Sequence, residues 1–438
     1  MKDRIREMYM KKIMTSEDAV KVVKSGDTVF LGITSSTADA LCDALEKRAD
    51  QLEEVTLTTS HALGSSTLVS KLDKRAFRVV SCFLGPWERA AARLGSVDYT
   101  SIHLSQIDIW CSQVVPPDVA FLEVSPPDEE GYMSYGSSGV SFFDHIREAA
   151  KIIIVQVNKN APWVYGDRNK IHISQVDIIT EADRPLPTID QNNADEAVQT
   201  ISSHIIEQIP DGACIQLGLG NVSSTVGLGL GNKNDLGIHS ELMTDSLMHL
   251  MKSGVVTNRY KKFKKWKSVT SFAYGTEELY RFIDHNKKMY FLPYTVVNDP
   301  VVIAKNDNFI SINTAFCIDL YGQVCADHLA GRQFSGTGGQ VDFVRGAQMS
   351  KGGKSFMAVT STNTNKRGER QSKIVAQLPK GSLVTTTRSD VQYVVTEYGC
   401  VDLKPLTMGD RAKALISLAH PDYREQLKEE AKALGIFS

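Results

Sequence analysis

Long apolar runs are missing from this sequence. No stretch of about 18 consecutive apolar residues, the length that a membrane-spanning helix needs, occurs anywhere in the 438 residues. The N-terminal stretch MKDRIREMYMKKIM is charged and lacks the apolar core and the small-residue cleavage site of a signal peptide. We therefore expect a protein that neither spans a membrane nor carries a secretion signal.

An excess of charge of one sign is also missing. Charged residues make up 23% of the sequence, hydrophobic residues make up 42%, and the formal net charge is -2. These values are typical of a folded soluble protein, and the near-neutral balance argues against nucleic acid as a partner. Because 438 residues exceed the size at which a single core keeps growing, we expect two or three domains.

Cysteine is sparse. The seven cysteines occur singly, without the CxxC pairs of a zinc site or the density of a secreted disulfide scaffold. Their positions are Cys42, Cys82, Cys111, Cys214, Cys317, Cys325 and Cys400. We expect reduced thiols that are mostly buried as small apolar side chains, a cytoplasmic location and no metal site.

Short apolar runs alternate with amphipathic stretches along the chain. Residues 29–33 (VFLGI) have the composition of a strand, and residues 37–45 carry apolar side chains at helical spacing. Residues 151–157 (KIIIVQV) are almost wholly apolar, as in a strand that is covered on both faces of its sheet. This pattern predicts an α/β fold with mainly parallel sheets.

A polar segment with two prolines, residues 181–196 (EADRPLPTIDQNNADE), is the best candidate for a linker. After it the chain repeats an earlier pattern, because residues 22–32 and residues 205–218 both read as a helix end, a turn and a strand that ends in glycine. We therefore predict two related open α/β domains, residues 1–190 and residues 191–438.

The first chemical motif is the turn QLGLG at residues 216–220, where a predicted strand runs into a helix. Gly218 and Gly220 let the backbone approach a ligand, and the amides at the start of a helix favour an anionic group such as a phosphate. A dinucleotide-binding GxGxxG motif fails here, because Ser223 replaces the third glycine. A plain tight turn is the alternative interpretation.

The second motif is GIHSELMTD, with Glu241 between a strand-like and a helix-like run. Open α/β sheets place ligands at such junctions. The Glu241 carboxylate can act there as a general base, as a nucleophile or as the N-cap of the following helix. A solvated or capping glutamate is the ordinary interpretation of a lone carboxylate.

The third motif is the glycine-rich loop FSGTGGQVDFVRGA, residues 334–347. Gly336, Gly338 and Gly339 leave the loop amides exposed, which suits the stabilisation of an oxyanion. Polar side chains then alternate with apolar ones through residue 345, a pattern that a simple turn does not need.

These three motifs together resemble the acetyl-CoA hydrolase/transferase family. Within this family the sequence is similar to butyryl-CoA:acetate CoA-transferases and 4-hydroxybutyrate CoA-transferases, and the resemblance covers essentially the whole chain. Shorter matches that occur in the same order are SPPD at residues 125–128, DLYGQV at 319–324, VVTEYG at 394–399 and AHPD at 419–422.

The resemblance implies two domains of one α/β fold, with the active site in the cleft between them. Glu241 matches the family's nucleophilic glutamate, and Gly339 matches the position whose amide faces the thioester oxygen. The positions that match or neighbour the CoA-binding segments of the family are Gln216, Leu217, Gly218, Leu219, Gly220, Phe316, Ser335 and Gly338. Coenzyme A is then a substrate, no cofactor is tightly bound, and we expect a homodimer or a higher homo-oligomer.

The implied reaction moves CoA between an acyl-CoA and a short-chain carboxylate through a covalent intermediate on Glu241. Acyl-CoA hydrolysis is the main alternative, because water needs no dedicated residue to resolve the same intermediate. A non-catalytic CoA-binding protein is a third possibility, against which the presence of Glu241 argues.

Overall fold

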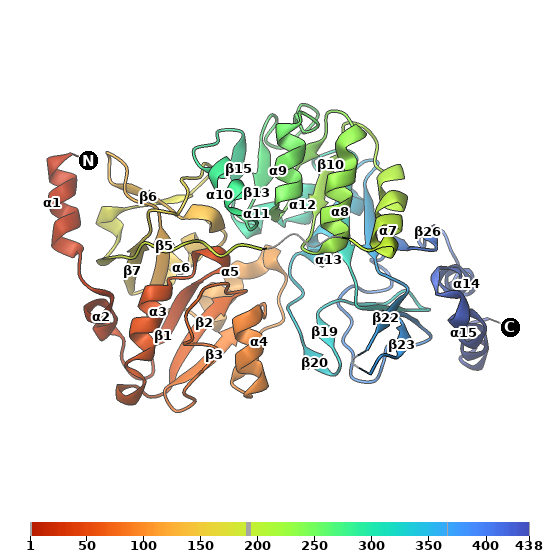
Figure 1. Ribbon diagram of the computed structural model, residues 1–438, viewed down its shortest axis with the longest axis horizontal. Coiled ribbons are helices and arrows are strands. Elements are labelled where there is room, and N and C mark those ends of the chain that lie inside the picture. Colours follow the sequence, from red (N-terminus) through yellow and green to blue (C-terminus); the bar gives the residue numbers. More distant parts are fainter. Residues whose placement is uncertain (1, 190–193, 366, 438) are drawn as a thin grey trace. The chain divides into compact units, whose positions relative to one another are not determined.

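The structure is a computed structural model in which residues 2–189, 194–365 and 367–437 are described (Figure 1). Strands and helices alternate throughout, which confirms the predicted α/β class. The chain divides into two units, one of residues 1–190 with 269–297 and the other of residues 191–268 with 298–438. Each unit contains its own sheet of mainly parallel strands.

The division differs in one respect from a single boundary after residue 190, because residues 269–297 belong to the first unit. Hydrogen bonds hold this segment there. The Asn169 side chain donates to the Phe291 carbonyl at 2.7 Å, and the Tyr294 amide donates to the Ser141 carbonyl at 2.8 Å.

The predicted linker, residues 181–196, is partly outside the described residues, since these exclude 190–193. Its first half packs on the first unit. The Ile189 amide donates to the Gly275 carbonyl at 3.2 Å, and the Tyr280 hydroxyl donates to the Pro187 carbonyl at 2.6 Å. Residues 182–189, which we call the strap, are therefore held on the first unit by hydrogen bonds.

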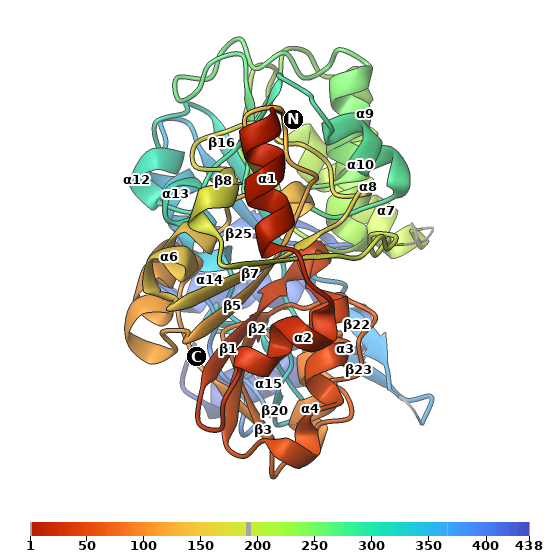
Figure 2. The same ribbon diagram turned by 90° about the vertical axis from the view of Figure 1, so that its left-hand side faces the viewer.

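The sheet of the first unit has seven strands, all parallel. In sheet order they are β4 (Val97–Tyr99), β3 (Phe77–Ser81), β2 (Val55–Ser60), β1 (Thr28–Ile33), β5 (Val119–Val124), β7 (Ile152–Val157) and β9 (Ile178–Glu181). Helices α3 (Asp39–Glu46) and α6 (Phe143–Ala149) lie on opposite sides of this sheet (Figure 2). Because both faces are covered, β7 is buried from its second residue onward, as its apolar sequence predicts.

The sheet of the second unit has six strands and is parallel except at one edge, where β26 is antiparallel to β25. In sheet order the strands are β11 (Gly237–Ile238), β10 (Cys214–Leu217), β16 (Phe309–Thr314), β21 (Lys354–Ala358), β25 (Tyr393–Thr396) and β26 (Gly399–Asp402). Figure 2 shows helices on both sides of this sheet. One side carries α7 (Glu196–Glu207), α8 (Asn221–Gly229) and α9 (Asp245–Lys252), and the other carries α12 (Pro300–Ile303) and α13 (Gln340–Met349).

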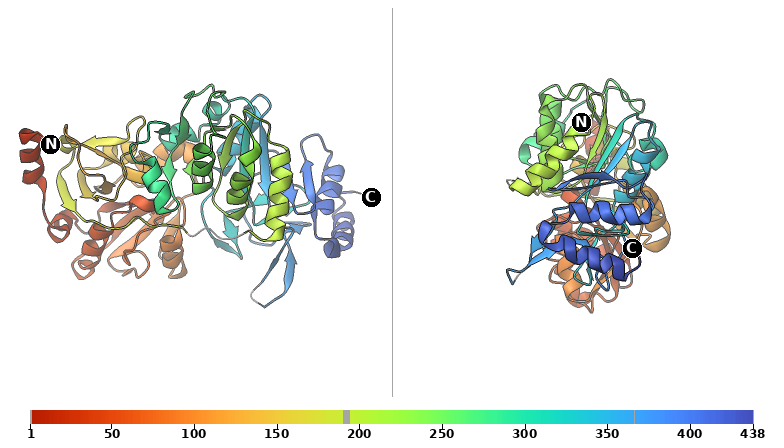
Figure 3. Two further views of the ribbon diagram at one scale, coloured as in Figure 1. Left: turned by 45° about the horizontal axis from the view of Figure 1, so that its top comes forward. Right: turned by 90° about the vertical axis from the view of Figure 1, so that its right-hand side faces the viewer.

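Smaller elements complete the two units. The remaining helices are α1 (Asp3–Lys12), α2 (Ser16–Ala19), α4 (Pro86–Arg93), α5 (Ile107–Ile109), α10 (Glu277–Ile283), α11 (Tyr294–Val297), α14 (Met408–Leu418) and α15 (Pro421–Ala433), the last two packed against each other (Figure 3). The short strands are β6 (Tyr132–Ser134), β8 (Lys170–His172), β12 (Leu242–Met243), β13 (Ser268–Thr270), β14 (Phe272–Ala273), β15 (Met289–Phe291), β17 (Cys317–Asp319), β18 (Val324–Cys325), β19 (His328–Leu329), β20 (Arg332–Gln333), β22 (Thr362–Thr364), β23 (Arg370–Ser372) and β24 (Ile374–Val375). None of the helices in the described part of the chain has the length and apolarity to cross a membrane.

Candidate functional site

The order of the strands places the first two motifs at the carboxyl ends of neighbouring strands in the second sheet. From β10 the chain passes through α8 to β11 on one side, whereas β16 on the other side continues to β21. The strand order therefore reverses between β10 and β16, and open α/β sheets bind ligands at the carboxyl ends of strands beside such a reversal. Residues 218–220 follow β10, Glu241 follows β11, and Phe316 follows β16.

The two residues before Glu241 are fully buried and fix the backbone that carries it. The Ser240 hydroxyl donates to the Leu217 carbonyl at 3.2 Å, which ties this segment to β10. The His239 ring packs among three phenylalanine rings, with centroids 5.8 to 6.4 Å away. These rings belong to Phe263, Phe309 and Phe343. Glu241 itself is partly exposed, so its position is defined while its side chain can be reached.

The structure excludes a capping role for Glu241. We predicted a junction between a strand and a helix, but the short strand β12 follows Glu241 directly, and the N-cap of α9 is Thr244. Among the interpretations of the sequence, those that use the carboxylate chemically are therefore favoured.

The surroundings of Glu241 alter its acidity. Desolvation by the surrounding protein raises the pKa of Glu241 to about 7, although a hydrogen bond from Asn298 opposes this effect. The charge of the buried Asp342 raises the pKa further. Near neutral pH a large share of Glu241 is thus an incompletely solvated carboxylate, which is a better nucleophile than a fully hydrated one.

Asn298 is the partner of Glu241 that the sequence analysis missed. Its Nδ2 donates to Glu241 Oε2 at 2.6 Å, and its side chain is fully buried. No motif marks Asn298, which lies 57 residues beyond Glu241 in the chain. A helix-start pattern follows it, since Asp299 caps α12 and Pro300 is the first helical residue.

We expect Asn298→Ala to lower kcat by about 10- to 100-fold, because a hydrogen bond to a charged group contributes about 1.5 to 3 kcal/mol. Asn298 lowers the pKa of Glu241, so its removal should shift the acidic limb of the pH–rate profile to higher pH. Steady-state kinetics between pH 5 and 9 would test this prediction. An unshifted limb would contradict it.

Gly339 has no room for a side chain because Glu241 and Asn298 lie against it. A Cβ atom at this position would be 2.2 Å from Glu241 Oε2 and 2.3 Å from Asn298 Nδ2. Gly339 is also the N-cap of α13, and the preceding Gly338 has a left-handed backbone with φ of +57°. The glycine loop, Glu241 and Asn298 therefore meet at one point.

The turn at residues 216–220 presents backbone rather than polar side chains. Gln216, which we predicted as a CoA contact, accepts hydrogen bonds from the Ser311 hydroxyl at 2.8 Å and the Ile312 amide at 3.2 Å, so its side-chain oxygen is directed at β16. Leu219 is 37% exposed. Gly220 has φ of +121° and open space where a Cβ would be, at the start of α8. This turn can accept an anionic group through its amides.

Phe316 and Ser335 lie on two segments that contact each other. The Phe316 ring meets the Phe334 ring edge to face, with centroids 5.2 Å apart. The Ser335 amide donates to the Asp327 carbonyl at 3.2 Å. The glycine loop is thus attached to the end of β16 by an aromatic contact as well as through α13.

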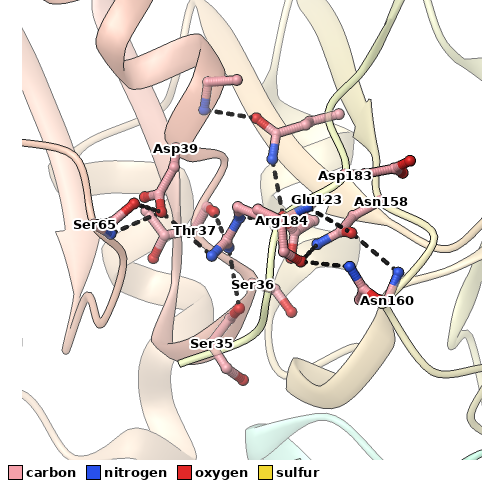
Figure 4. Close-up of polar contacts among 12 residues, drawn as sticks. Ser35, Ser36, Thr37, Asp39, Ser65, Glu123, Asn158, Asn160, Asp183 and Arg184 are labelled. Carbon is pink, nitrogen blue, oxygen red and sulfur yellow. Dashed lines mark hydrogen bonds and ion pairs between the residues drawn. The ribbon is translucent and has the colours of Figure 1, made fainter. Parts of the chain in front are cut away.

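A second polar cluster, in the first unit, centres on Arg184 of the strap (Figure 4). Its Nε donates to Glu123 Oε2 at 2.7 Å, and its Nη1 is 3.3 Å from Asp39 Oδ2. Glu123 and Asp39 are buried, and desolvation raises the pKa of Glu123 to about 7. The sequence analysis missed this cluster because Arg184 belongs to a stretch that reads as a linker.

Replacing Arg184 should destabilise the first unit strongly. Arg184→Met would leave two buried carboxylates without their cation, and breaking a buried ion pair in this way costs about 3 to 5 kcal/mol. Chemical denaturation at pH 8, where Glu123 is mostly ionised, would measure the loss. A change below 1 kcal/mol would show that the cluster contributes little.

The residues that the structure describes include no group of three or more His, Cys, Asp and Glu side chains that could hold a metal ion. The groups available at the second-unit site are a carboxylate, a carboxamide and backbone amides. They can support nucleophilic attack by the carboxylate and stabilisation of an oxyanion.

Comparison with known proteins covers nearly the whole chain. Residues 1–190 match the acetyl-CoA hydrolase/transferase N-terminal domain, and residues 275–431 match its C-terminal domain. A 4-hydroxybutyrate coenzyme A transferase from Clostridium kluyveri is 39% identical over 97% of this chain and 98% of its own length. A butyryl-CoA:acetate CoA-transferase from Anaerostipes caccae is 38% identical over 99% and 98%, respectively. The crystal structure of RipA from Yersinia pestis has a TM-score of 0.93 at 36% identity, covering 99% of this chain and 100% of RipA.

Proposed function

Because this chain belongs to the acetyl-CoA hydrolase/transferase family, we propose that it transfers CoA between a short-chain acyl-CoA and a free carboxylate, as the names of its relatives describe. The observation that carries the proposal is the contact of Glu241 with both Asn298 and Gly339 at the carboxyl edge of the second sheet. A transfer of this kind needs no ATP, because a thioester is exchanged for a thioester.

In the proposed first half-reaction, a Glu241 carboxylate oxygen attacks the thioester carbonyl, and the CoA thiolate leaves from an acyl-glutamyl anhydride. The thiolate then attacks the glutamyl carbonyl, which gives a glutamyl-CoA thioester and releases the first carboxylate. The incoming carboxylate repeats these two steps in reverse order. Ping-pong kinetics follow, because the first acid leaves before the second enters.

Each addition places negative charge on a carbonyl oxygen. Asn298 Nδ2 is directed at Glu241 and is in place to donate to an oxyanion formed on the glutamyl carbonyl. We assign the Gly339 amide to the oxyanion on the acyl carbonyl. One such donor contributes about 3 to 4 kcal/mol to the transition state in comparable sites.

Acyl-CoA hydrolysis is the alternative that the family allows, because water can attack the same intermediates. A single assay separates the possibilities. The enzyme is mixed with butyryl-CoA with and without acetate, and acetyl-CoA and free CoA are followed. Acetyl-CoA formation that requires acetate indicates transfer, free CoA released without acetate indicates hydrolysis, and no reaction indicates a binding protein.

We expect monocarboxylates of about two to five carbons as substrates, held by apolar contacts that discriminate weakly for each methylene. The arginine within the three motifs, Arg345, is paired with Asp390, to which its Nε and Nη2 both donate at 3.1 Å, so we do not expect it to hold a second carboxylate. Acetate, propionate, butyrate and 4-hydroxybutyrate should therefore all be used, with kcat/KM changing by about 10- to 200-fold for each methylene. A clear preference for succinate in a competition assay would contradict this prediction.

A further inference from the structure

Two of the cysteines that are scattered in the sequence become neighbours in the fold. Cys317 of β17 lies directly opposite Cys325 of β18 in an antiparallel pair. Only seven residues separate them, and the turn between the strands is closed by a hydrogen bond from the Gln323 amide to Asp319 Oδ1 at 2.9 Å. The strand pairing therefore brings the two thiols to the same face of a hairpin.

The spacing of such a pair suits a disulfide bond. Directly opposite residues in antiparallel strands have Cα atoms about 4.5 to 5.5 Å apart, and disulfides join Cα atoms about 4.4 to 6.8 Å apart. Closure of the bond therefore needs no large movement of the backbone.

The two thiols of the pair differ in exposure and in acidity. Cys317 is partly exposed, so a small reagent can reach it, whereas Cys325 is buried and its Sγ is 3.0 Å from the His328 carbonyl oxygen. A hydrogen bond from the Cys317 thiol to the Cys325 sulfur lowers the pKa of Cys325 and raises the pKa of Cys317. By contrast, burial raises the pKa of Cys42, Cys82, Cys111 and Cys214.

We propose that Cys317 and Cys325 form a reversible thiol–disulfide site that low-molecular-weight disulfides oxidise. In the first step Cys317, the thiol that the reagent can reach, loses its proton and attacks the reagent, so that Cys317 carries a mixed disulfide and one reagent thiol is released. The second cysteine then attacks the Cys317 sulfur, and the second reagent thiol is released. Two protein thiols are oxidised, and one reagent disulfide is reduced to two thiols.

The hairpin is connected to segments near the proposed CoA site. The Phe316 amide donates to the Cys325 carbonyl at 2.8 Å, and the Phe316 ring contacts Phe334 next to the glycine loop. A disulfide would hold Phe316 in one position relative to β18. This consequence rests on the proposed function, whereas the thiol chemistry does not.

Oxidised glutathione tests the proposal on the intact protein. Both cysteines lie on one tryptic peptide, residues 306–332, which contains no other cysteine. We expect native wild type to lose two thiols per chain, this peptide to lose two hydrogens in mass, and dithiothreitol to restore both. Cleavage after Tyr321 by chymotrypsin should then leave two fragments that stay joined until they are reduced.

Three variants provide the controls. In Cys325→Ser the glutathione adduct should persist on Cys317, because no second thiol displaces it, and Cys317→Ser should form no intramolecular disulfide. Cys400→Ser is the matched control, because Cys400 is also partly exposed but does not lie opposite another cysteine, and it should behave as wild type. A peptide 306–332 that stays reduced in the native wild type would overturn the proposal. If CoA transfer is absent but the disulfide forms, only the proposed function fails.

Discussion

Glu241→Ala is expected to lower the rate of CoA exchange by about 10⁴-fold or more, the range seen when a covalent nucleophile is removed. The reason is that Glu241 supplies the carboxylate that lies against both Asn298 and Gly339, and water cannot form a stable acyl intermediate in its place. The loss should appear in kcat for both directions of the reaction. Binding of CoA, measured by calorimetry, should change little.

The fold of Glu241→Ala should be intact, and the pH dependence of its stability can be compared with that of wild type to check this. Because desolvation by the surrounding protein raises this pKa from 4.5 to about 7, protonated Glu241 stabilises the folded state at low pH, and this contribution is lost as pH rises through 7. Glu241→Ala removes the contribution, so its stability should fall less than that of wild type between pH 5 and pH 8. Glu88 and Glu123 also have pKa values of about 7, so only the difference between the two proteins is informative.

Gly339→Val is expected to lower kcat by about 10²- to 10³-fold, comparable to the removal of one oxyanion donor. The first atom of the new side chain would overlap Glu241 Oε2 and Asn298 Nδ2, so the loop or the nucleophile must move. Gly231→Ala is a matched control, because a Cβ there meets open space and its φ is not positive. It should leave kcat and stability unchanged.

A substitution in the turn at residues 216–220 should affect KM instead. Gly218→Ala fits the folded protein, since its Cβ would be 3.6 Å from the Ile312 carbonyl oxygen, an ordinary contact. The added methyl group would obstruct a ligand that lies against the backbone, so KM for acyl-CoA should rise about tenfold while bound substrate still reacts. Equal losses of kcat at Gly218 and Gly339 would mean that the turn only positions Glu241.

Local sequence patterns were enough for the elements and the motifs. The expected strands at 29–33 and 151–157 are β1 and β7, and the expected helix at 37–45 is α3, each within two residues of its bounds. The pattern of apolar residues that identifies each of these elements lies within a few consecutive residues, so it can be read from the sequence alone. Glu241 and the glycine loop also stand out locally, because glycine and charge are unusual beside buried strands.

Features that depend on distant parts of the chain could not be predicted in this way. Asn298 meets Glu241 only because β11 and the segment before α12 converge. Arg184 looks like a linker residue until Asp39 and Glu123 surround it. Cys317 and Cys325 become a pair through strand register, which a count of cysteines does not reveal.

That residues 269–297 belong to the first unit could not be predicted either, because it also depends on contacts with distant parts of the chain. No proline lies where this segment begins, and its hydrogen bonds to residues such as Asn169 and Ser141 show where it belongs. Proline content and polarity can mark the position of a linker, but they cannot show that a later segment of the chain packs on the first unit again.

Trapping the covalent intermediate tests the role of Glu241 most directly. The enzyme is incubated with butyryl-CoA, treated with hydroxylamine or borohydride, and digested for mass spectrometry. We predict that hydroxylamine leaves a hydroxamate and that borohydride leaves an alcohol on Glu241 alone, that both require acyl-CoA, and that Glu241→Ala shows neither. An enzyme that exchanges CoA while the Glu241 peptide stays unmodified, or that is labelled on another residue, would contradict the proposed mechanism.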